Sequence, residues 1–202
     1  MGYLIGSIPT AYLLVKWKSR VDIRTVGSGN VGTLNSYEVT NSKLVGVGVL
    51  LVDLLKGAAG ALVSEAILGS DFLYGAVGGI GVVLGHNFPL WLRFRGGRGL
   101  APAAGVFFVI GWAFVALWCL FWGIGFLLFK KVNMGNVFAS LIALLFIVVA
   151  PVSILDQMVS PEVVIDQFRV FGVILLSIVL VKHIEPVRDF IEQRRLGKQE
   201  LK

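Results

Sequence analysis

The sequence predicts an all-α integral membrane protein, a bundle of about seven transmembrane helices, and three observations support this fold class. Hydrophobic residues make up 56% of the 202 residues, and the mean hydropathy is +0.85. Charged residues make up 15%, whereas an average soluble domain has about 25%. The apolar residues gather in long runs, as helices that cross a bilayer require. We expect one membrane-embedded domain over 1–202, ending in a basic cytoplasmic tail over 183–202.

The apolar runs define the individual spans. Six segments are apolar over most of their length: 1–15, 44–68, 72–92, 99–129, 134–155 and 168–181. The fourth has 31 residues, and one helix of that size would be roughly 46 Å long, against a hydrocarbon core of about 30 Å. Gly105 and Gly111 offer break points. We therefore expect two helices here, near 100–111 and 113–129, and seven spans in total.

The positions of the basic residues indicate how these spans are oriented. With the amino terminus outside, seven spans place sixteen of the 18 lysines and arginines on the inner side, all except Lys56 and Arg169. Cationic residues prefer cytoplasmic loops. The net charge of +6 is thus explained by topology in a cell (inner) membrane, and we expect no nucleic-acid partner. The first apolar run is not expected to be a cleavable signal peptide, because its charges follow it.

The residues that usually bind metals are scarce. The chain has one cysteine, Cys119, which lies inside an apolar run, and two histidines. Burial in apolar surroundings keeps a thiol protonated and inert. No set of His, Cys and Glu has the spacing of a zinc site. We therefore expect neither a bound metal nor a cofactor.

Unusual polar residues collect on the predicted cytoplasmic side. They form GSGNVGTLNSYEVT (27–40), GHNFPLWLRFRGGRG (85–99), KKVNMGNVFAS (130–140) and KHIEP (182–186). Glycine runs let backbone N–H groups approach a ligand closely and form an anion-binding concavity. In the second stretch three arginines surround three glycines, which adds charge-assisted donors. This combination suits phosphate, although such a loop also occurs as a simple anchor to anionic lipid.

Two further features leave alternatives open. His86 and His183 both lie near this face, where a histidine can orient a nucleophile or simply fill a structural role. Asp53 and Lys56 lie three residues apart inside the second span. This spacing predicts a mutual ion pair facing the bundle interior. The alternative is that Lys56 lines an anionic site.

Taken in order, the motifs resemble the bacterial membrane glycerol-3-phosphate acyltransferases that use acyl phosphate as donor, the PlsY family. The matching stretches are GSIPTAYLL (6–14), DIRTVGSGNVG (22–32), VDLLKG (52–57), GHNFPLWLRFRGGRG (85–99) and KHIE (182–185). The resemblance implies seven spans and a catalytic face at the cytoplasm. It implies transfer of a fatty acyl group from acyl phosphate to the 1-hydroxyl of glycerol 3-phosphate, a step of phospholipid biosynthesis that yields lysophosphatidic acid and phosphate.

The same resemblance implies roles for individual residues. Catalytic or orienting roles fall to His86, His183 and Asn35. The cradle for phosphate and acyl phosphate would be Ser28, Gly29, Asn30, Gly32, Gly96, Gly97, Arg98 and Gly99. Possible contacts to the acceptor are Arg24, Glu38, Lys56, Arg93, Asn133 and Asn136. The implied partners are these two substrates and the lipid bilayer.

The acceptor half of the site departs from the family pattern. Thr33 and Leu34 stand where the family usually has Ala-Thr, and Glu38 stands at the position of an arginine expected to hold the acceptor phosphate. Two other readings therefore remain open. One is a related acyltransferase with a different acceptor, such as a polyol or an amine that pairs with Glu38. The other is a non-enzymatic transporter or scaffold, although a transporter would be expected to show internal repeats.

Overall fold

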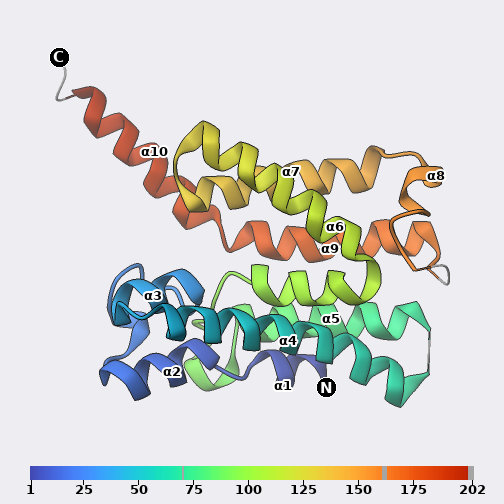
Figure 1. The fold of residues 1–202 in the computed structure, drawn as a ribbon, viewed down its shortest axis with the longest axis horizontal. Helices are drawn as coiled ribbons and strands as arrows, with labels where there is room; N and C mark the ends of the chain where they lie inside the picture. The colour runs from blue at the N-terminus through green and yellow to red at the C-terminus, as the bar shows by residue number, and fades with distance from the viewer. Residues whose placement is uncertain (70, 161–162, 200–202) are drawn as a thin grey trace.

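The computed structural model describes residues 1–69, 71–160 and 163–199, and within these residues every regular element is a helix (Figure 1). The last three residues of the predicted tail therefore lie outside the description. The elements are α1 (Gly2–Gly6), α2 (Thr10–Ser19), η1 (Ile23–Thr25), α3 (Thr33–Thr40), α4 (Lys43–Leu68), α5 (Phe72–Asn87), η2 (Leu90–Leu92), α6 (Leu100–Phe129), α7 (Val132–Val149), α8 (Val152–Leu155), α9 (Ile165–Val181) and α10 (Ile184–Gln199).

Several of these helices are long and apolar enough to cross a membrane. By length and composition four qualify among the described residues: α4, α5 extended through η2, α6 and α7. A fifth is obtained if α9 and α10, which bend by 47° at a short break, count as one span. The predicted fold class, an all-α integral membrane protein, is confirmed. The predicted basic tail is the helix α10, which leaves the bundle at an angle (Figure 1).

The long apolar run 99–129 is broken where the sequence suggested. Gly111 has φ −177° and ψ 89°, so the helical hydrogen-bond ladder of α6 is interrupted there. The first half of α6 lies beside α4 and α5, and the second half lies beside α7 (Figure 1). Gly105, the other expected break point, stays helical. The interruption explains how a 30-residue helix fits a hydrocarbon core of about 30 Å.

Glycines let neighbouring helices approach at backbone distance. A Cβ atom on Gly57 of α4 would lie 2.0 Å from the carbonyl oxygen of Pro102, and one on Gly105 of α6 would lie 1.9 Å from that of Leu54. Lipid supplies no hydrophobic driving force between helices. Close packing at small residues stabilises their association instead. Gly105 is therefore retained for helix packing, and the first half of α6 is held firmly against α4.

Away from this contact, aromatic rings fill the interior between α6 and α9. The rings of Phe114 and Phe168 lie 4.8 Å apart, and those of Phe107 and Phe171 lie 5.7 Å apart. At the end of α7, Arg169 of α9 donates hydrogen bonds to the carbonyl oxygens of Ile147 (3.1 Å) and Ala150 (2.6 Å). The final carbonyls of a helix have no partner within it, so this arginine satisfies them inside an apolar environment.

The opposite end of the bundle gathers the polar segments. There α3 packs on the start of α4, and the loops 27–32 and 93–99 lead into α3 and α6. The hydroxyl of Ser42 accepts a hydrogen bond from the amide of Val45 and so caps α4. The starts of α4, α6 and α7 therefore lie at one end, with their unsatisfied N–H groups near the same region.

Candidate active site

A cavity of about 610 Å³ lies among these helix starts. Its lining residues are Asn30, Gly32, Thr33, Leu34, Tyr37, Lys43, Gly46, Val47, Leu50, Asp53, His86, Arg98, Gly99, Leu100, Ala101, Ala104, Trp118, Trp122, Val132, Asn133 and Asn136. They come from the first glycine loop, α3, α4, the second glycine loop and both halves of α6, together with α5 and α7. Charged and amide groups share the wall with apolar ones.

One face of α4 sets the length of this cavity. Lys43, Gly46, Val47, Leu50 and Asp53 all line it, and their spacing of three or four residues places them in one stripe along the helix. Ten residues of helix separate the first from the last, a distance of roughly 15 Å. The cavity therefore extends from a cationic mouth at Lys43 to a buried carboxylate at Asp53.

The first glycine loop is held in shape by one buried amide. The side chain of Asn35, 1% exposed, donates to the carbonyl oxygens of Ile23 (3.3 Å), Val26 (3.2 Å) and Asn30 (3.0 Å). Its oxygen accepts from the amide of Ser28 at 3.0 Å. All the hydrogen-bonding capacity of this amide except one lone pair is thus used inside the loop.

Backbone conformation explains two of the three glycines in this loop. Gly27 and Gly29 have φ values of +59° and +69°, a left-handed region that side chains disfavour. A Cβ atom on Gly27 would also lie 2.2 Å from Oδ1 of Asn35. The loop therefore depends on glycine for its turn and on Asn35 for its internal hydrogen bonds.

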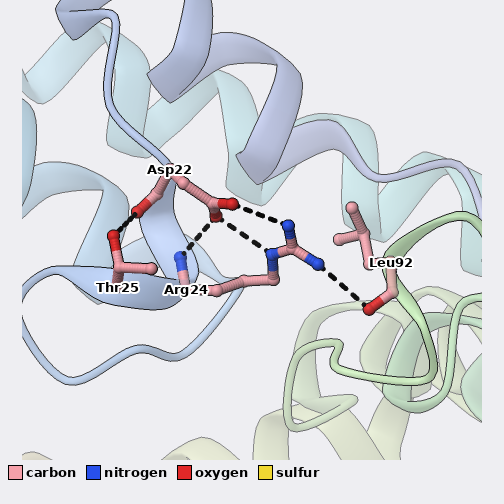
Figure 2. Close-up of polar contacts among 4 residues, drawn as sticks. All are labelled: Asp22, Arg24, Thr25 and Leu92. Carbon is pink, nitrogen blue, oxygen red and sulfur yellow. Dashed lines mark hydrogen bonds and ion pairs between the residues drawn. The ribbon is translucent and has the colours of Figure 1, made fainter.

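Arg24 of η1, just before the first loop, contacts Leu92 of η2, directly before the second loop (Figure 2). Its Nε and one terminal nitrogen donate to the two carboxylate oxygens of Asp22, at 3.0 and 2.6 Å, and the other terminal nitrogen donates to the carbonyl of Leu92 at 3.2 Å. The hydrogen bonds from Arg24 lower the pKa of Asp22 to about 2. Arg24 is absent from the cavity lining, so the structure does not bring this predicted acceptor contact to the site.

The second glycine loop is shaped by close packing. Gly97 donates its amide to the carbonyl of His86 at 3.0 Å, and a Cβ atom on Gly97 would lie 2.1 Å from Nε2 of the same histidine. A Cβ atom on Gly96 would lie 2.1 Å from the carbonyl oxygen of His86. Gly99, with φ +85°, would place one 2.6 Å from Oδ1 of Asn87. The end of α5 is therefore the support on which this loop rests.

Beneath the loop, His86 connects to the buried ion pair. Nζ of Lys56 lies 2.9 Å from Oδ1 of Asp53, and Nδ1 of His86 lies 3.8 Å from the same oxygen. Lys56 also donates to the carbonyl of Ile8 at 3.1 Å. The predicted Asp53–Lys56 pair is confirmed. Lys56 does not line the main cavity, because its amine is already used by Asp53 and Ile8.

Arg98 is the cation of the second loop that faces the cavity. Its guanidinium donates to the side-chain oxygen of Asn133 at 2.7 Å, which links the loop to the start of α7. Burial lowers the pKa of Arg98, while the carboxylates of Glu185, Asp189 and Glu38 act in the opposite direction. Arg98 thus lies partly enclosed at the cavity wall, with carboxylates nearby that favour its charged form.

His183 is fully enclosed near this region. It is 1% exposed, and its Nδ1 lies 2.8 Å from the carbonyl oxygen of Val179. A carbonyl only accepts, so Nδ1 carries the proton. Its Nε2 has no hydrogen-bond partner within the described part of the chain. His183 does not line the cavity as the side chains stand.

The structure divides the predicted site residues into two groups. Those that line the cavity are Asn30, Gly32, His86, Arg98, Gly99, Asn133 and Asn136. Those that do not are Arg24, Ser28, Gly29, Asn35, Glu38, Lys56, Arg93, Gly96, Gly97 and His183. Lys43, which the charge pattern assigned only to membrane topology, does line it. Its place directly after a capping serine, at the start of a long helix, was the available signal. No three His, Cys, Asp or Glu side chains in the described ranges are grouped to hold a metal ion.

Comparison with known proteins relates this architecture to one family. The family model described as glycerol-3-phosphate acyltransferase matches residues 1–193. A glycerol-3-phosphate acyltransferase of Thermotoga petrophila is 37% identical over 145 residues, which is 72% of this chain and 73% of that protein. One of Allorhizobium ampelinum is 38% identical over 157 residues, 76% of this chain and 71% of that protein.

Solved structures agree with the sequence comparison. The crystal structure of PlsY, an integral membrane glycerol 3-phosphate acyltransferase, in its glycerol 3-phosphate form matches with a TM-score of 0.78 and 31% identity. The match covers 96% of this chain and 90% of that one. The lysophosphatidic acid form matches with a TM-score of 0.75. With nearly its whole length matched in both sequence and fold, the chain belongs to the glycerol-3-phosphate acyltransferase family.

Proposed function

We propose that the chain transfers a fatty acyl group from acyl phosphate to the 1-hydroxyl of glycerol 3-phosphate. The observation that carries this proposal is the mixed character of the cavity. Lys43, Arg98 and two asparagines of α7 provide polar and cationic groups at its wall, and Leu100, Ala104 and Trp118 continue into a smaller apolar pocket of about 60 Å³. A donor with a phosphate head and a hydrocarbon chain needs both kinds of wall.

The reaction balances without a further reactant. The acceptor hydroxyl oxygen attacks the acyl carbon and forms the new ester bond, while the bond from that carbon to the phosphate oxygen breaks. The phosphate leaves with the electron pair, and the hydroxyl proton passes to a phosphate oxygen. Because an acyl phosphate is an activated mixed anhydride, the protein mainly has to position two substrates and stabilise developing negative charge.

The described contacts support distinct roles for the residues. Arg98 lies between the polar and apolar walls, so its guanidinium binds the donor phosphate with the backbone of the second glycine loop. His86 supports that loop and faces the cavity, so it positions the donor. Asn35 acts through the first loop as a positioning residue. His183 does not line the cavity, so it acts as a positioning residue through its buried Nε2, which has no hydrogen-bond partner among the described residues.

We also propose that the site faces the cytoplasm of a cell whose inner membrane holds the protein. The cationic residues support this orientation, since sixteen of the 18 lie on one side when seven spans begin from an outer amino terminus. The cavity opens among the starts of α4, α6 and α7, on the side of Lys43 and Arg98. Glycerol 3-phosphate would then reach the site from water, and the donor would reach it from the bilayer.

Acyl transfer by the purified protein in lipid vesicles tests this function. Palmitoyl phosphate and palmitoyl-coenzyme A are compared as donors, and glycerol 3-phosphate, glycerol and an amino alcohol as acceptors, with products identified by mass spectrometry. We expect lysophosphatidic acid from palmitoyl phosphate and glycerol 3-phosphate. Turnover only with an uncharged or amine acceptor would contradict the proposal and favour an acceptor that pairs with Glu38. Glu38 does not line the cavity, which supports glycerol 3-phosphate as the acceptor.

A further inference from the structure

The charges that face the cavity do not balance. In the part of the chain that the structure describes, the lysine, arginine, histidine and acidic residues that line it are Lys43, Arg98, Asp53 and His86. The carboxylate of Asp53 lies 2.9 Å from the amine of Lys56, so its charge is already matched from outside the cavity. Among the residues that line the cavity, Lys43 and Arg98 therefore keep a positive charge for ligands, although the carboxylates of Glu185, Asp189 and Glu38 act on Arg98 from outside the lining. Two such charges suit two phosphate groups.

These two cations have different surroundings. Arg98 is hydrogen-bonded to Asn133 and is followed, after Gly99, by Leu100 and Ala101, which begin the apolar wall. A phosphate attached to a hydrocarbon chain fits this position, because the chain can follow that wall. Lys43 is exposed and has no recorded ion pair in the described ranges. A fully polar ligand that arrives from water fits the Lys43 position.

The local backbone adds to the positive potential at Lys43. It is the first residue of α4, where the helix dipole and unpaired N–H groups favour an anion. The neighbouring wall is α3, whose Tyr37 packs so closely on Gly46 that a Cβ atom there would lie 3.0 Å from Cβ of Tyr37. This contact holds α3 against the start of α4, and Thr33 and Tyr37 of α3 line the same cavity as Lys43.

We infer that Lys43 binds the phosphate of the glycerol 3-phosphate acceptor, while Arg98 binds that of the donor. The inference rests on the proposed function and adds the residue that recognises the acceptor. It also accounts for Glu38, because an acceptor phosphate held at the start of α4 does not need a cation at position 38 of α3. A flexible lysine at the mouth suits an acceptor that must enter and leave from water.

Steady-state kinetics of Lys43→Ala and Lys43→Arg in lipid vesicles test the inference, with each substrate varied in turn. For Lys43→Ala we expect the KM for glycerol 3-phosphate to rise by about tenfold or more, as loss of a charge-assisted hydrogen bond implies. The KM for palmitoyl phosphate should stay within about twofold, since Arg98 is intact. Lys43→Arg should keep most of the acceptor affinity. Lys18→Ala, an exposed lysine of α2 outside the cavity, is the matched control.

The outcomes separate the inference from the proposed function. An unchanged KM for glycerol 3-phosphate in Lys43→Ala, with an active wild type, would overturn the inference alone. A raised KM for palmitoyl phosphate instead would also overturn it, by assigning Lys43 to the donor. A wild type without turnover from palmitoyl phosphate to glycerol 3-phosphate would refute the proposed function, and the inference with it. Alanine favours helices, so the start of α4 is expected to stay folded in the variant.

Discussion

The two glycine loops of this protein reach a defined shape by different means. The loop 27–32 is fixed by hydrogen bonds to one buried side chain, the amide of Asn35, and by two glycines with positive φ. The loop 93–99 is fixed by contact, because Gly96 and Gly97 rest directly on the backbone and ring of His86. The first loop depends mainly on the hydrogen bonds of Asn35, although Gly27 also has no room for a side chain. The second depends mainly on the absence of side chains, although the amide of Gly97 also donates a hydrogen bond to the carbonyl of His86.

This difference predicts how each loop fails. A hydrogen-bonded loop loses stability in steps as its bonds are removed, at a net cost of about 1 kcal/mol for each. A loop in backbone contact has no room for relaxation, so even one added methyl group must displace it. The second loop also carries Arg98, which lines the cavity and which we propose binds the donor. We therefore expect the largest losses of activity from small changes in the second loop.

Gly97→Ala is expected to have the largest effect on turnover. Its Cβ atom would lie 2.1 Å from Nε2 of His86 and 2.6 Å from the carbonyl oxygen of Val31, and the latter belongs to backbone that cannot rotate away. We expect kcat for palmitoyl transfer to fall by about a hundredfold, as displaced catalytic geometry implies. Gly123→Ala is the control, because among the described residues no atom beyond the local helix backbone lies within 4 Å of a Cβ there. Equal activities of the two variants would contradict the packing account.

Asn35→Ala should have the next largest effect, and it should appear in stability and activity together. Four hydrogen bonds are lost, so we expect a clear drop in the thermal midpoint measured in detergent, and a roughly tenfold lower kcat/KM for both substrates. Asn35→Asp keeps only the acceptor for Ser28 and should be similarly impaired. Loss of activity with an unchanged thermal midpoint would instead support a direct catalytic role for this amide.

Glu38→Arg should improve acceptor binding modestly. The carboxylate of Glu38 acts on Arg98 through space but does not line the cavity. Reversing its charge should lower the KM for glycerol 3-phosphate by about threefold at low ionic strength, with little effect at about 1 M salt, where screening is strong. Glu38→Gln should fall between wild type and Glu38→Arg. If the KM for glycerol 3-phosphate in Glu38→Arg equals that of wild type at every salt concentration, the charge at position 38 does not act on the site.

Asp22→Asn should have the smallest effect, a lower thermal midpoint, because it weakens the ion pair that holds Arg24 of η1 against η2. The pKa of Asp22 is lowered to about 2 by its hydrogen bonds from Arg24, so this carboxylate stabilises the fold above its ordinary pKa and loses that effect as the pH falls toward 2. The difference in thermal midpoint between wild type and Asp22→Asn should be constant from about pH 5 to 8 and shrink below about pH 4. A difference that grows on acidification would contradict this pairing.

Much of the fold and part of the site could be predicted from the sequence. Hydropathy gives the long helices, and the length of the run 99–129 requires the break that occurs at Gly111. The spacing of Asp53 and Lys56 gives their ion pair. The glycine and arginine pattern identifies the loops, and Arg98 and Gly99 line the cavity. Each of these features arises from residues that lie close together in the sequence, so the sequence alone is enough to predict it.

The remaining features depend on contacts between distant segments. The sequence does not show that the amide of Asn35 is consumed within its own loop, or that Arg24 is used by Asp22 and Leu92. Neither does it show that Lys43 faces the cavity, since a lysine before an apolar run has an ordinary explanation as a topology signal. Only the packing of α3 on α4 and of the loops on α5 decides which polar groups remain for substrates.

Of the arginines in the second glycine loop, Arg98 is the one that we propose acts on the substrates. The most direct measurement compares initial rates of lysophosphatidic acid formation by Arg98→Ala and Arg93→Ala in the same vesicles. Arg98 lines the cavity and contacts Asn133, whereas Arg93 is exposed and does not line it. We predict a loss of about a hundredfold or more for Arg98→Ala and a nearly unchanged rate for Arg93→Ala. Full activity of Arg98→Ala, or equal losses in both variants, would contradict the account.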